Sequence, residues 1–122
     1  MKKVVGLIGL GKMGSLMAEN LLDHKYKVVA HNRSPEPIRK IVRKGAKSAY
    51  TIEEFVTKLK SPRIIILMVT AGKPVDMVLK LLMPYLTKGD IIIDGGNNYY
   101  KDSIGRYKLL KKMGVNFLDM GT

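Results

Sequence analysis

The sequence contains no cysteine, and its 10 acidic residues are outnumbered by 22 lysines and arginines. Without cysteine the chain forms no disulfide and offers no thiolate to a metal, which fits a reducing cytoplasm. It has no run of about 18 consecutive apolar residues, so we expect no membrane-spanning helix. Met1-Lys2-Lys3 leads directly into a strand-like run, unlike a cleaved signal peptide. We therefore expect a cytoplasmic protein with no metal and no membrane partner.

The net charge of +12 indicates anionic partners, which could be nucleic acid or small phosphorylated ligands. The basic residues are scattered along the chain. The densest group, residues 108–112, is interrupted by Leu109 and Leu110 and has no interleaved aromatic residues on which bases could stack. This distribution favours small phosphorylated ligands, and we predict that the protein does not bind nucleic acid.

Strand and helix patterns alternate along the 122 residues, a length typical of one domain. Alternation of this kind predicts an α/β fold with a Rossmann-like, doubly wound parallel sheet of six strands in the order 3-2-1-4-5-6. We expect a single dinucleotide-binding domain over residues 1–122. The predicted strands are residues 4–8, 27–31, 46–49, 63–69, 91–94 and 115–118, and the predicted helices are residues 12–24, 35–45, 51–58, 73–82 and 99–113.

The first predicted strand runs directly into Gly9-Leu10-Gly11-Lys12-Met13-Gly14 and then into a helical pattern. In this context a Gly-x-Gly-x-x-Gly loop indicates a dinucleotide site. Gly9 would allow the sharp turn, Gly11 the close approach of a pyrophosphate, and Gly14 the packing of the helix on the strand. The N-terminus of the helix would attract the anion. The alternative is an ordinary tight turn that happens to contain three glycines.

The residues at the end of the second predicted strand indicate whether the site binds NAD or NADP. Domains that prefer NAD usually carry an acidic residue there for the ribose hydroxyls, whereas this chain has Asn32, Arg33 and Ser34. A guanidinium about 4 Å from one phosphate charge gains roughly 4 kcal/mol at an effective dielectric near 20. We therefore predict NADP rather than NAD. The alternatives are a solvated loop arginine at Arg33 and a helix cap at Ser34.

Three stretches together resemble the 6-phosphogluconate dehydrogenase family. They are the glycine loop, Met68-Val69-Thr70-Ala71-Gly72 with Val75-Asp76 behind it, and Asp94-Gly95-Gly96-Asn97-Asn98-Tyr99-Tyr100. The third is the most specific, because the related β-hydroxyacid dehydrogenases usually have a short Ser/Thr-containing sequence there. The resemblance covers nearly all of this chain but only the N-terminal portion of the family.

The resemblance implies an NADP-dependent, metal-free oxidation and decarboxylation of 6-phosphogluconate to ribulose 5-phosphate. The glycine loop would hold the pyrophosphate, residues 32–34 the 2′-phosphate, and residues 69–71 the nucleotide side of the crevice. Asn97 would contact both the nicotinamide ribose and the substrate; its alternative role is a turn residue with positive φ. The implied cofactor-binding residues are Gly9, Leu10, Gly11, Lys12, Met13, Gly14, Asn32, Arg33, Ser34, Val69, Thr70, Ala71 and Asn97.

Two departures from the family pattern limit what the resemblance implies. Many NADP-using members have a lysine at the position of Thr70, which removes one cationic contact with the cofactor. The family also continues into a Ser-Gly-Gly substrate loop and a helical domain that carries its general base, its acid and most of its dimer interface. We therefore assign no catalytic residue here, and we expect the chain alone to bind cofactor without turnover.

Two rival interpretations stay open at this point. One is a β-hydroxyacid dehydrogenase cofactor domain, and the other is a nucleotide-binding module that performs no hydride transfer. We interpret Asp94 as a turn or cap carboxylate, His24 as a solvated helix residue and His31 as a strand-end residue.

Overall fold

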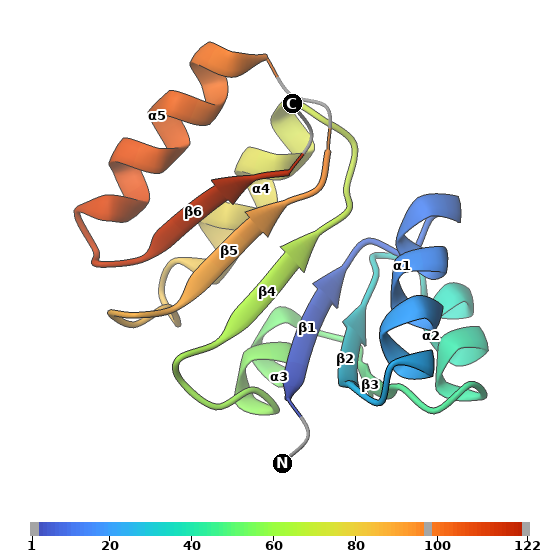
Figure 1. Ribbon diagram of the computed structural model, residues 1–122. Helices are drawn as coiled ribbons and strands as arrows, with labels where there is room; N and C mark the ends of the chain where they lie inside the picture. Colours follow the sequence, from blue (N-terminus) through green and yellow to red (C-terminus); the bar gives the residue numbers. More distant parts are fainter. Residues whose placement is uncertain (1–2, 97–98, 121–122) are drawn as a thin grey trace.

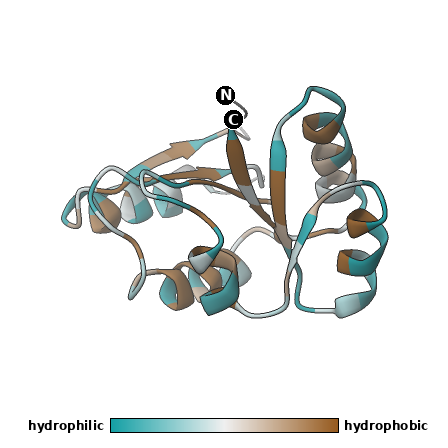
Figure 2. Ribbon diagram, turned by 90° about the horizontal axis from the view of Figure 1, so that it is seen from below, coloured by the Kyte–Doolittle hydropathy of each residue, from teal (hydrophilic) through white to brown (hydrophobic). Residues whose placement is uncertain are grey.

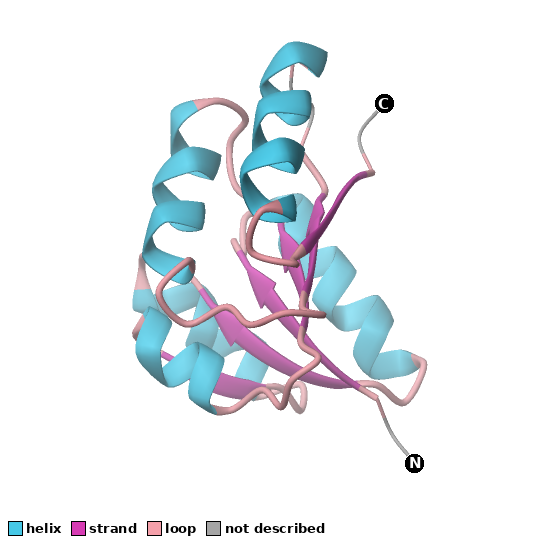
Figure 3. Ribbon diagram, turned by 90° about the vertical axis from the view of Figure 1, so that its left-hand side faces the viewer, coloured by secondary structure: helices cyan, strands magenta, loops and turns pink. Residues whose placement is uncertain are grey.

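The computed structural model describes residues 3–96 and 99–120, which form three layers, with helices on both faces of one parallel sheet (Figures 1 and 3). The strands within these residues are β1 (Val4–Ile8), β2 (Lys27–His31), β3 (Lys47–Ala49), β4 (Ile64–Leu67), β5 (Ile91–Asp94) and β6 (Asn116–Asp119). The helices are α1 (Lys12–Asp23), α2 (Pro35–Val42), α3 (Ile52–Thr57), α4 (Lys73–Leu82) and α5 (Tyr100–Lys111). The sheet order is β3-β2-β1-β4-β5-β6, as the alternating pattern predicts.

Two apolar cores lie on the two faces of the sheet. Helices α1 and α2 cover one face with Ala18, Ile38 and Ile41, while α3, α4 and α5 cover the other with side chains such as Phe55 and Leu110. The strands between them are apolar because both of their faces are covered (Figure 2). None of the described helices is long and apolar enough to cross a membrane.

The sheet has its topological switch point between β1 and β4. Strand β1 pairs in parallel with β2 on one side and with β4 on the other, so that Ile8 has both His31 and Leu67 as register partners. Helix α1 leaves β1 toward one face, and α4 leaves β4 toward the other (Figure 1). The carboxyl ends of these two strands therefore border a crevice, which is where ligands bind in folds of this type.

The local signals at the helix ends are only partly correct. Residues 51–54 have the Ser/Thr-x-x-Glu spacing that predicts a capping box. Thr51 does cap α3, because its Oγ1 accepts from Glu54 N at 3.0 Å, and the Glu54 carboxylate accepts from Tyr50 N. Ser34 occupies the N-cap position of α2 with Pro35 after it, but its side chain makes no cap hydrogen bond. The predicted N-cap position of Ser34 is therefore confirmed, but the hydroxyl hydrogen bond typical of such a cap is absent. Strand β4 is also shorter than the predicted 63–69, because the chain leaves the sheet after Leu67.

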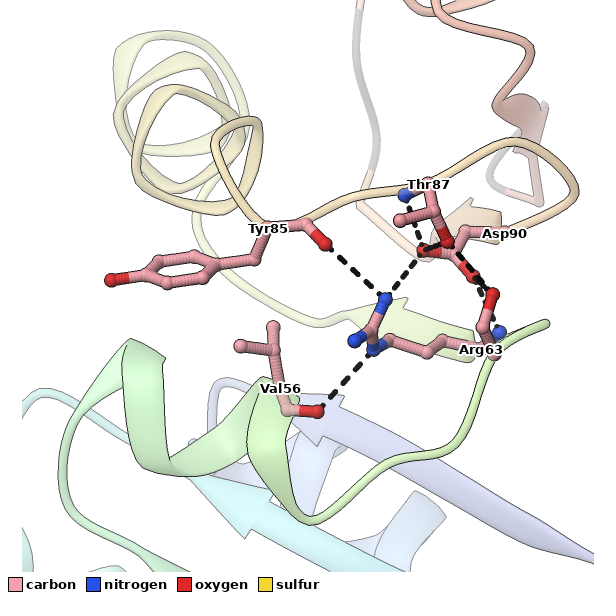
Figure 4. Close-up of polar contacts among 6 residues, drawn as sticks. Val56, Arg63, Tyr85, Thr87 and Asp90 are labelled. Atoms are coloured by element: carbon pink, nitrogen blue, oxygen red, sulfur yellow. Dashed lines mark hydrogen bonds and ion pairs between the residues drawn. The ribbon is translucent and has the colours of Figure 1, made fainter.

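The opposite end of the sheet is fastened by a buried ion pair between β4 and β5. The Asp90 carboxylate is fully buried and accepts from Arg63 N at 2.7 Å, Arg63 Nη1 at 3.0 Å and Thr87 N at 2.9 Å (Figure 4). Arg63 also donates from Nε to the Val56 carbonyl and from Nη1 to the Tyr85 carbonyl. One side chain thus joins α3, the loop after α4 and the start of β5.

This network makes stability depend on pH. Burial disfavours ionisation of Asp90, but hydrogen bonds from Arg63, Thr87 and Ser61 outweigh it and hold the pKa of Asp90 below its ordinary value. A carboxylate whose pKa is lower in the folded state stabilises the fold at pH values above its unfolded-state pKa of about 3.9. This stabilisation is lost as the pH falls through the folded-state pKa. We therefore expect the melting temperature to fall as the pH is lowered below about 4.

The measurement is thermal unfolding of the wild-type chain and of Asp90→Asn between pH 7 and pH 3. The stability difference between the two proteins should shrink as the pH falls, because only the wild type loses the Asp90 carboxylate interactions. A difference that stays constant across this range would contradict the assignment.

Candidate cofactor site

The loop between β1 and α1 requires glycine at two positions. Gly9 has φ of +103°, and a Cβ built there would lie 2.5 Å from the Met68 carbonyl oxygen. A Cβ on Gly14 would overlap the Gly9 carbonyl oxygen. The sharp turn and the close packing of α1 on β1 that the pattern predicts are therefore both present.

Gly11 differs from these two because its surroundings are open. Apart from its chain neighbours and its own helix, no heavy atom of the described residues lies within 4 Å of a Cβ built at Gly11. Gly11 is the N-cap of α1, and no described side chain caps this end of the helix. The first N–H groups of a helix have no acceptor within it, so open space in front of them suits a phosphate group. This cradle fits the pyrophosphate of a dinucleotide.

Asn32 ties the glycine loop to the loop after β2. Its Oδ1 accepts from Leu10 N at 2.8 Å, and its Nδ2 donates to the Ser34 carbonyl at 3.1 Å. The Leu10 amide thus has an acceptor within the protein, and the Leu10 side chain is buried. Sequence reasoning placed Asn32 beside the cofactor but did not predict this bond, because it joins residues 22 positions apart.

A cleft of about 560 Å³ opens at the switch point, between the carboxyl ends of β1, β2 and β4. Arg33 lies at its border on an exposed loop, and the glycine loop forms another part of its wall. The residues that line it are Ile8, Gly9, Gly11, His31, Asn32, Arg33, Ile52, Met68, Val69, Thr70, Pro74, Met77, Val78 and Leu81.

The structure brings six of the predicted site residues together along this cleft, and they are Gly9, Gly11, Asn32, Arg33, Val69 and Thr70. Leu10 and Lys12 line a second groove, of about 590 Å³, between α1 and α2, which shares Gly11 with the cleft. Neither opening is lined by Met13 and Gly14, in the first turn of α1, or by Ser34 and Ala71, on the adjoining loops. Asn97 lies outside the described residues.

One wall of the cleft was missed by sequence reasoning. The same cleft that the glycine loop and Arg33 line has an apolar surface from α4, made by Pro74, Met77, Val78 and Leu81. Met77 is 64% exposed and Leu81 is 57% exposed, although both are large and apolar. They lie four residues apart, so a second apolar stripe on α4 was the available signal. An apolar wall of this kind suits the flat face of a nucleotide base.

Asp94 acts as the predicted turn carboxylate at the end of β5. It is fully buried, and its Oδ1 accepts from Gly96 N at 2.9 Å. Burial raises the pKa of Asp94, and the carboxylate of Asp119, its register partner on β6, raises it further. The Asp94 carboxylate therefore orients the Gly95-Gly96 turn through its hydrogen bond with Gly96 N.

The two histidines have structural partners, in agreement with the sequence interpretation. His24 Nδ1 lies 2.8 Å from the Asn20 carbonyl oxygen at the end of α1, and His31 Nδ1 lies 2.8 Å from the Ala49 carbonyl oxygen. Among the described residues no three His, Asp or Glu side chains are grouped so that they could hold a metal ion.

Comparison with known proteins agrees with this geometry. Residues 4–122 match the family model described as the NAD binding domain of 6-phosphogluconate dehydrogenase. The decarboxylating 6-phosphogluconate dehydrogenase of Chlamydia muridarum is 47% identical over 122 residues, and that of Candida albicans is 46% identical over the same length. Each match covers 96% of this chain, but only 26% and 24% of those proteins. The chain therefore spans about a quarter of the length of these relatives.

Solved structures give the same result. The 6-phosphogluconate dehydrogenase of Plasmodium falciparum, studied in its apo form, with NADP+ and with 6-phosphogluconate, superposes with a TM-score of 0.86 at 35% identity. That match covers 93% of this chain and 26% of the other. The 3-hydroxyisobutyrate dehydrogenase of Mycobacterium tuberculosis superposes with a TM-score of 0.87 over 98% of this chain and 40% of its own, but at 21% identity this shows a shared fold alone.

The family model covers nearly the whole chain, and both the open glycine cradle and the cleft at the switch point are features such a domain requires. This chain belongs to the family of the NAD-binding domain of 6-phosphogluconate dehydrogenase.

Proposed function

We propose that the cleft at the switch point binds NADP, and that the chain serves an oxidative decarboxylation of 6-phosphogluconate. The cofactor would contribute the hydride acceptor, and the residues described here would bind and orient it. The Gly11 end of α1 would receive the pyrophosphate, Arg33 the 2′-phosphate, and the apolar surface of α4 the adenine base. The support for the reaction itself is the name and activity of the relatives, of which this chain spans a quarter.

The choice of NADP depends on Arg33. It borders the same cleft as Gly11, follows the end of β2, and is exposed on the loop where an NAD-binding domain would usually carry a carboxylate. Since the Ser34 side chain makes no cap hydrogen bond, its hydroxyl is available as a further donor to the same phosphate. The solved relative with NADP+ supports the same choice.

The other expected partners stay predictions. The expected substrate is a phosphorylated sugar acid that contacts Asn97. We also expect no binding of nucleic acid, a cytoplasmic location, and a homodimer for a full-length form. The net charge of +12 agrees with ligands that carry phosphate groups.

Removal of the Arg33 side chain should abolish the preference for NADPH over NADH. We expect Arg33→Ala to weaken NADPH at least about tenfold, which is a third of the electrostatic gain estimated for one guanidinium–phosphate contact. NADH affinity should stay unchanged, because NADH carries no 2′-phosphate. Isothermal titration calorimetry of the 122-residue chain with both reduced cofactors gives the four affinities.

Arg39→Ala is the matched control, since Arg39 is an exposed arginine of α2 that does not line the cleft. It should leave both affinities within twofold of wild type. If the wild-type chain binds NADH as tightly as NADPH, the assignment of NADP is refuted, and if it binds neither, the cofactor site is refuted.

A further inference from the structure

The loops that follow β4 and β5 touch each other at the edge of the cofactor cleft. A Cβ built on Gly95 would overlap the Met68 sulfur, and Gly95 N donates to the Leu67 carbonyl at 2.8 Å. Met68, Val69 and Thr70 line the cleft from the first of these loops. The spacing of the two loops therefore sets the shape of this side of the cleft.

One buried cation, Arg106 of α5, contacts residues at the ends of both loops. It is only 4% exposed, and its Nε donates to Asp76 Oδ1 at 2.7 Å while Nη2 donates to Asp76 Oδ2 at 3.2 Å. Nη2 also donates to the Gly72 carbonyl at 3.1 Å, and Nη1 lies 4.0 Å from Asp94 Oδ2. A guanidinium suits this position, because its planar fork presents several donors in fixed directions at once.

Each of these three partners of Arg106 lies at the end of one of the two loops. Gly72 is the N-cap of α4, with φ of +91°, and Asp76 lies in the first turn of that helix. Asp94 holds the turn after β5 through the bond from Gly96 N. The guanidinium therefore links the start of α4 to the turn after β5, 18 or more residues further along the chain.

We propose that Arg106 is a positioning residue that fixes the spacing of these two loops before the cofactor arrives. It lines neither opening, so it would act through Gly72, Asp76 and Asp94 rather than by contact with the ligand. A site held in its binding shape avoids the cost of ordering loops on binding. This inference rests on the proposed function for its consequence in cofactor binding, but the loop spacing itself is testable without cofactor.

The direction of the expected effect follows from which half of the cofactor meets which loop. The glycine loop follows β1 and Asn32 and Arg33 follow β2, whereas the partners of Arg106 named above belong to α4, the loop before it and β5. These elements would hold the 2′-phosphate and the adenosine half, together with the apolar surface of α4, which the buried apolar side chains of that helix keep in place without Arg106. The turn after β5 lies on the other side of the switch point, where the nicotinamide half would extend.

The test compares Arg106→Lys with Arg63→Lys, which removes the guanidinium fork from the Arg63–Asp90 pair at the opposite end of the sheet. In the unliganded chains, amide hydrogen exchange followed by NMR should be at least tenfold faster at Gly95 and Gly96 in Arg106→Lys. The exchange of these two amides should be unchanged in Arg63→Lys. Unchanged exchange in Arg106→Lys would overturn the proposal.

The second arm of the test uses two ligands, NADPH and the half-cofactor 2′,5′-ADP, measured by calorimetry. Arg106→Lys should weaken NADPH at least tenfold and 2′,5′-ADP less than twofold, while Arg63→Lys should change neither. Equal losses for both ligands would indicate a general structural role and overturn the proposal. Asp76→Asn, which keeps the side-chain shape, should reproduce the pattern more weakly and replaces Arg106→Lys if that variant fails to fold.

The two arms of the test distinguish a failure of the proposed function from a failure of the role proposed for Arg106. A wild-type chain that binds neither ligand refutes the proposed function and the consequence for affinity, whereas the exchange rates at Gly95 and Gly96 still decide whether Arg106 sets the loops.

Discussion

Replacement of Arg63 by methionine is expected to lower the free energy of unfolding by about 3–5 kcal/mol, the usual cost of removing one partner from a buried ion pair. The Asp90 carboxylate that remains would be fully buried, with its charge no longer compensated by the guanidinium. The Val56 carbonyl of α3 and the Tyr85 carbonyl of the loop after α4 would both lose the hydrogen-bond donors that Arg63 provides. Methionine keeps an unbranched apolar stem, so the loss reports polar contacts more than volume.

The measurement is urea unfolding of the wild type, Arg63→Met, Asp90→Asn and the double variant. Because the two residues share one network, the double variant should lose less than the sum of the single variants. Arg39→Ala is the control, since the Arg39–Glu36 pair is exposed and should contribute less than about 1 kcal/mol. If Arg63→Met costs no more than Arg39→Ala, the ion pair does not fasten this end of the sheet.

The second large effect is a contrast between two glycines of the same loop. Alanine at Gly11 should change stability by no more than about 1 kcal/mol in either direction, because the negative φ and open surroundings suit alanine while the N-cap position disfavours it. The same methyl group would occupy the space through which a pyrophosphate approaches the start of α1. We therefore expect Gly11→Ala to fold normally and to bind NADPH at least tenfold more weakly.

Alanine at Gly14 should instead damage the fold itself. Its methyl group would overlap the Gly9 carbonyl oxygen, so α1 must move away from β1, at an overpacking cost of about 1–3 kcal/mol. Thermal unfolding and calorimetry of both variants separate the two roles. If Gly11→Ala binds NADPH as tightly as the wild type, the assignment of the glycine loop to the cofactor site is wrong.

The order of the strands and the type of every described element could be predicted from the sequence. Apolar runs such as residues 64–67 pack on both faces and leave little choice of position in the sheet. Local signals were less reliable at element ends. Thr51 caps α3 as its spacing predicts, whereas Ser34, with a comparable signal, leaves its hydroxyl out of the cap. Propensity at a helix end is weak, and the loop that holds Asn32 and Arg33 decides the outcome there.

The candidate site could be predicted only where its residues belong to one short motif. The glycine loop and Arg33 follow directly from their places after β1 and β2. The apolar wall of α4 could not be assigned, since nothing in the sequence says that Met77 and Leu81 line the same cleft as Arg33. Asn97, the predicted contact with nicotinamide ribose and substrate, lies outside the described residues.

The sequence by itself determined the alternation of strands and helices, the glycine turn, and the place of Arg33 after the second strand, where we propose that the 2′-phosphate binds. These are local properties, because each depends on residues that are neighbours along the chain. The tertiary structure alone decided that Asn32 holds the glycine loop and that Arg63 and Arg106 fasten opposite ends of the sheet. Those contacts join residues 22 to 30 positions apart, and only the packing of the strands brings them within hydrogen-bond distance.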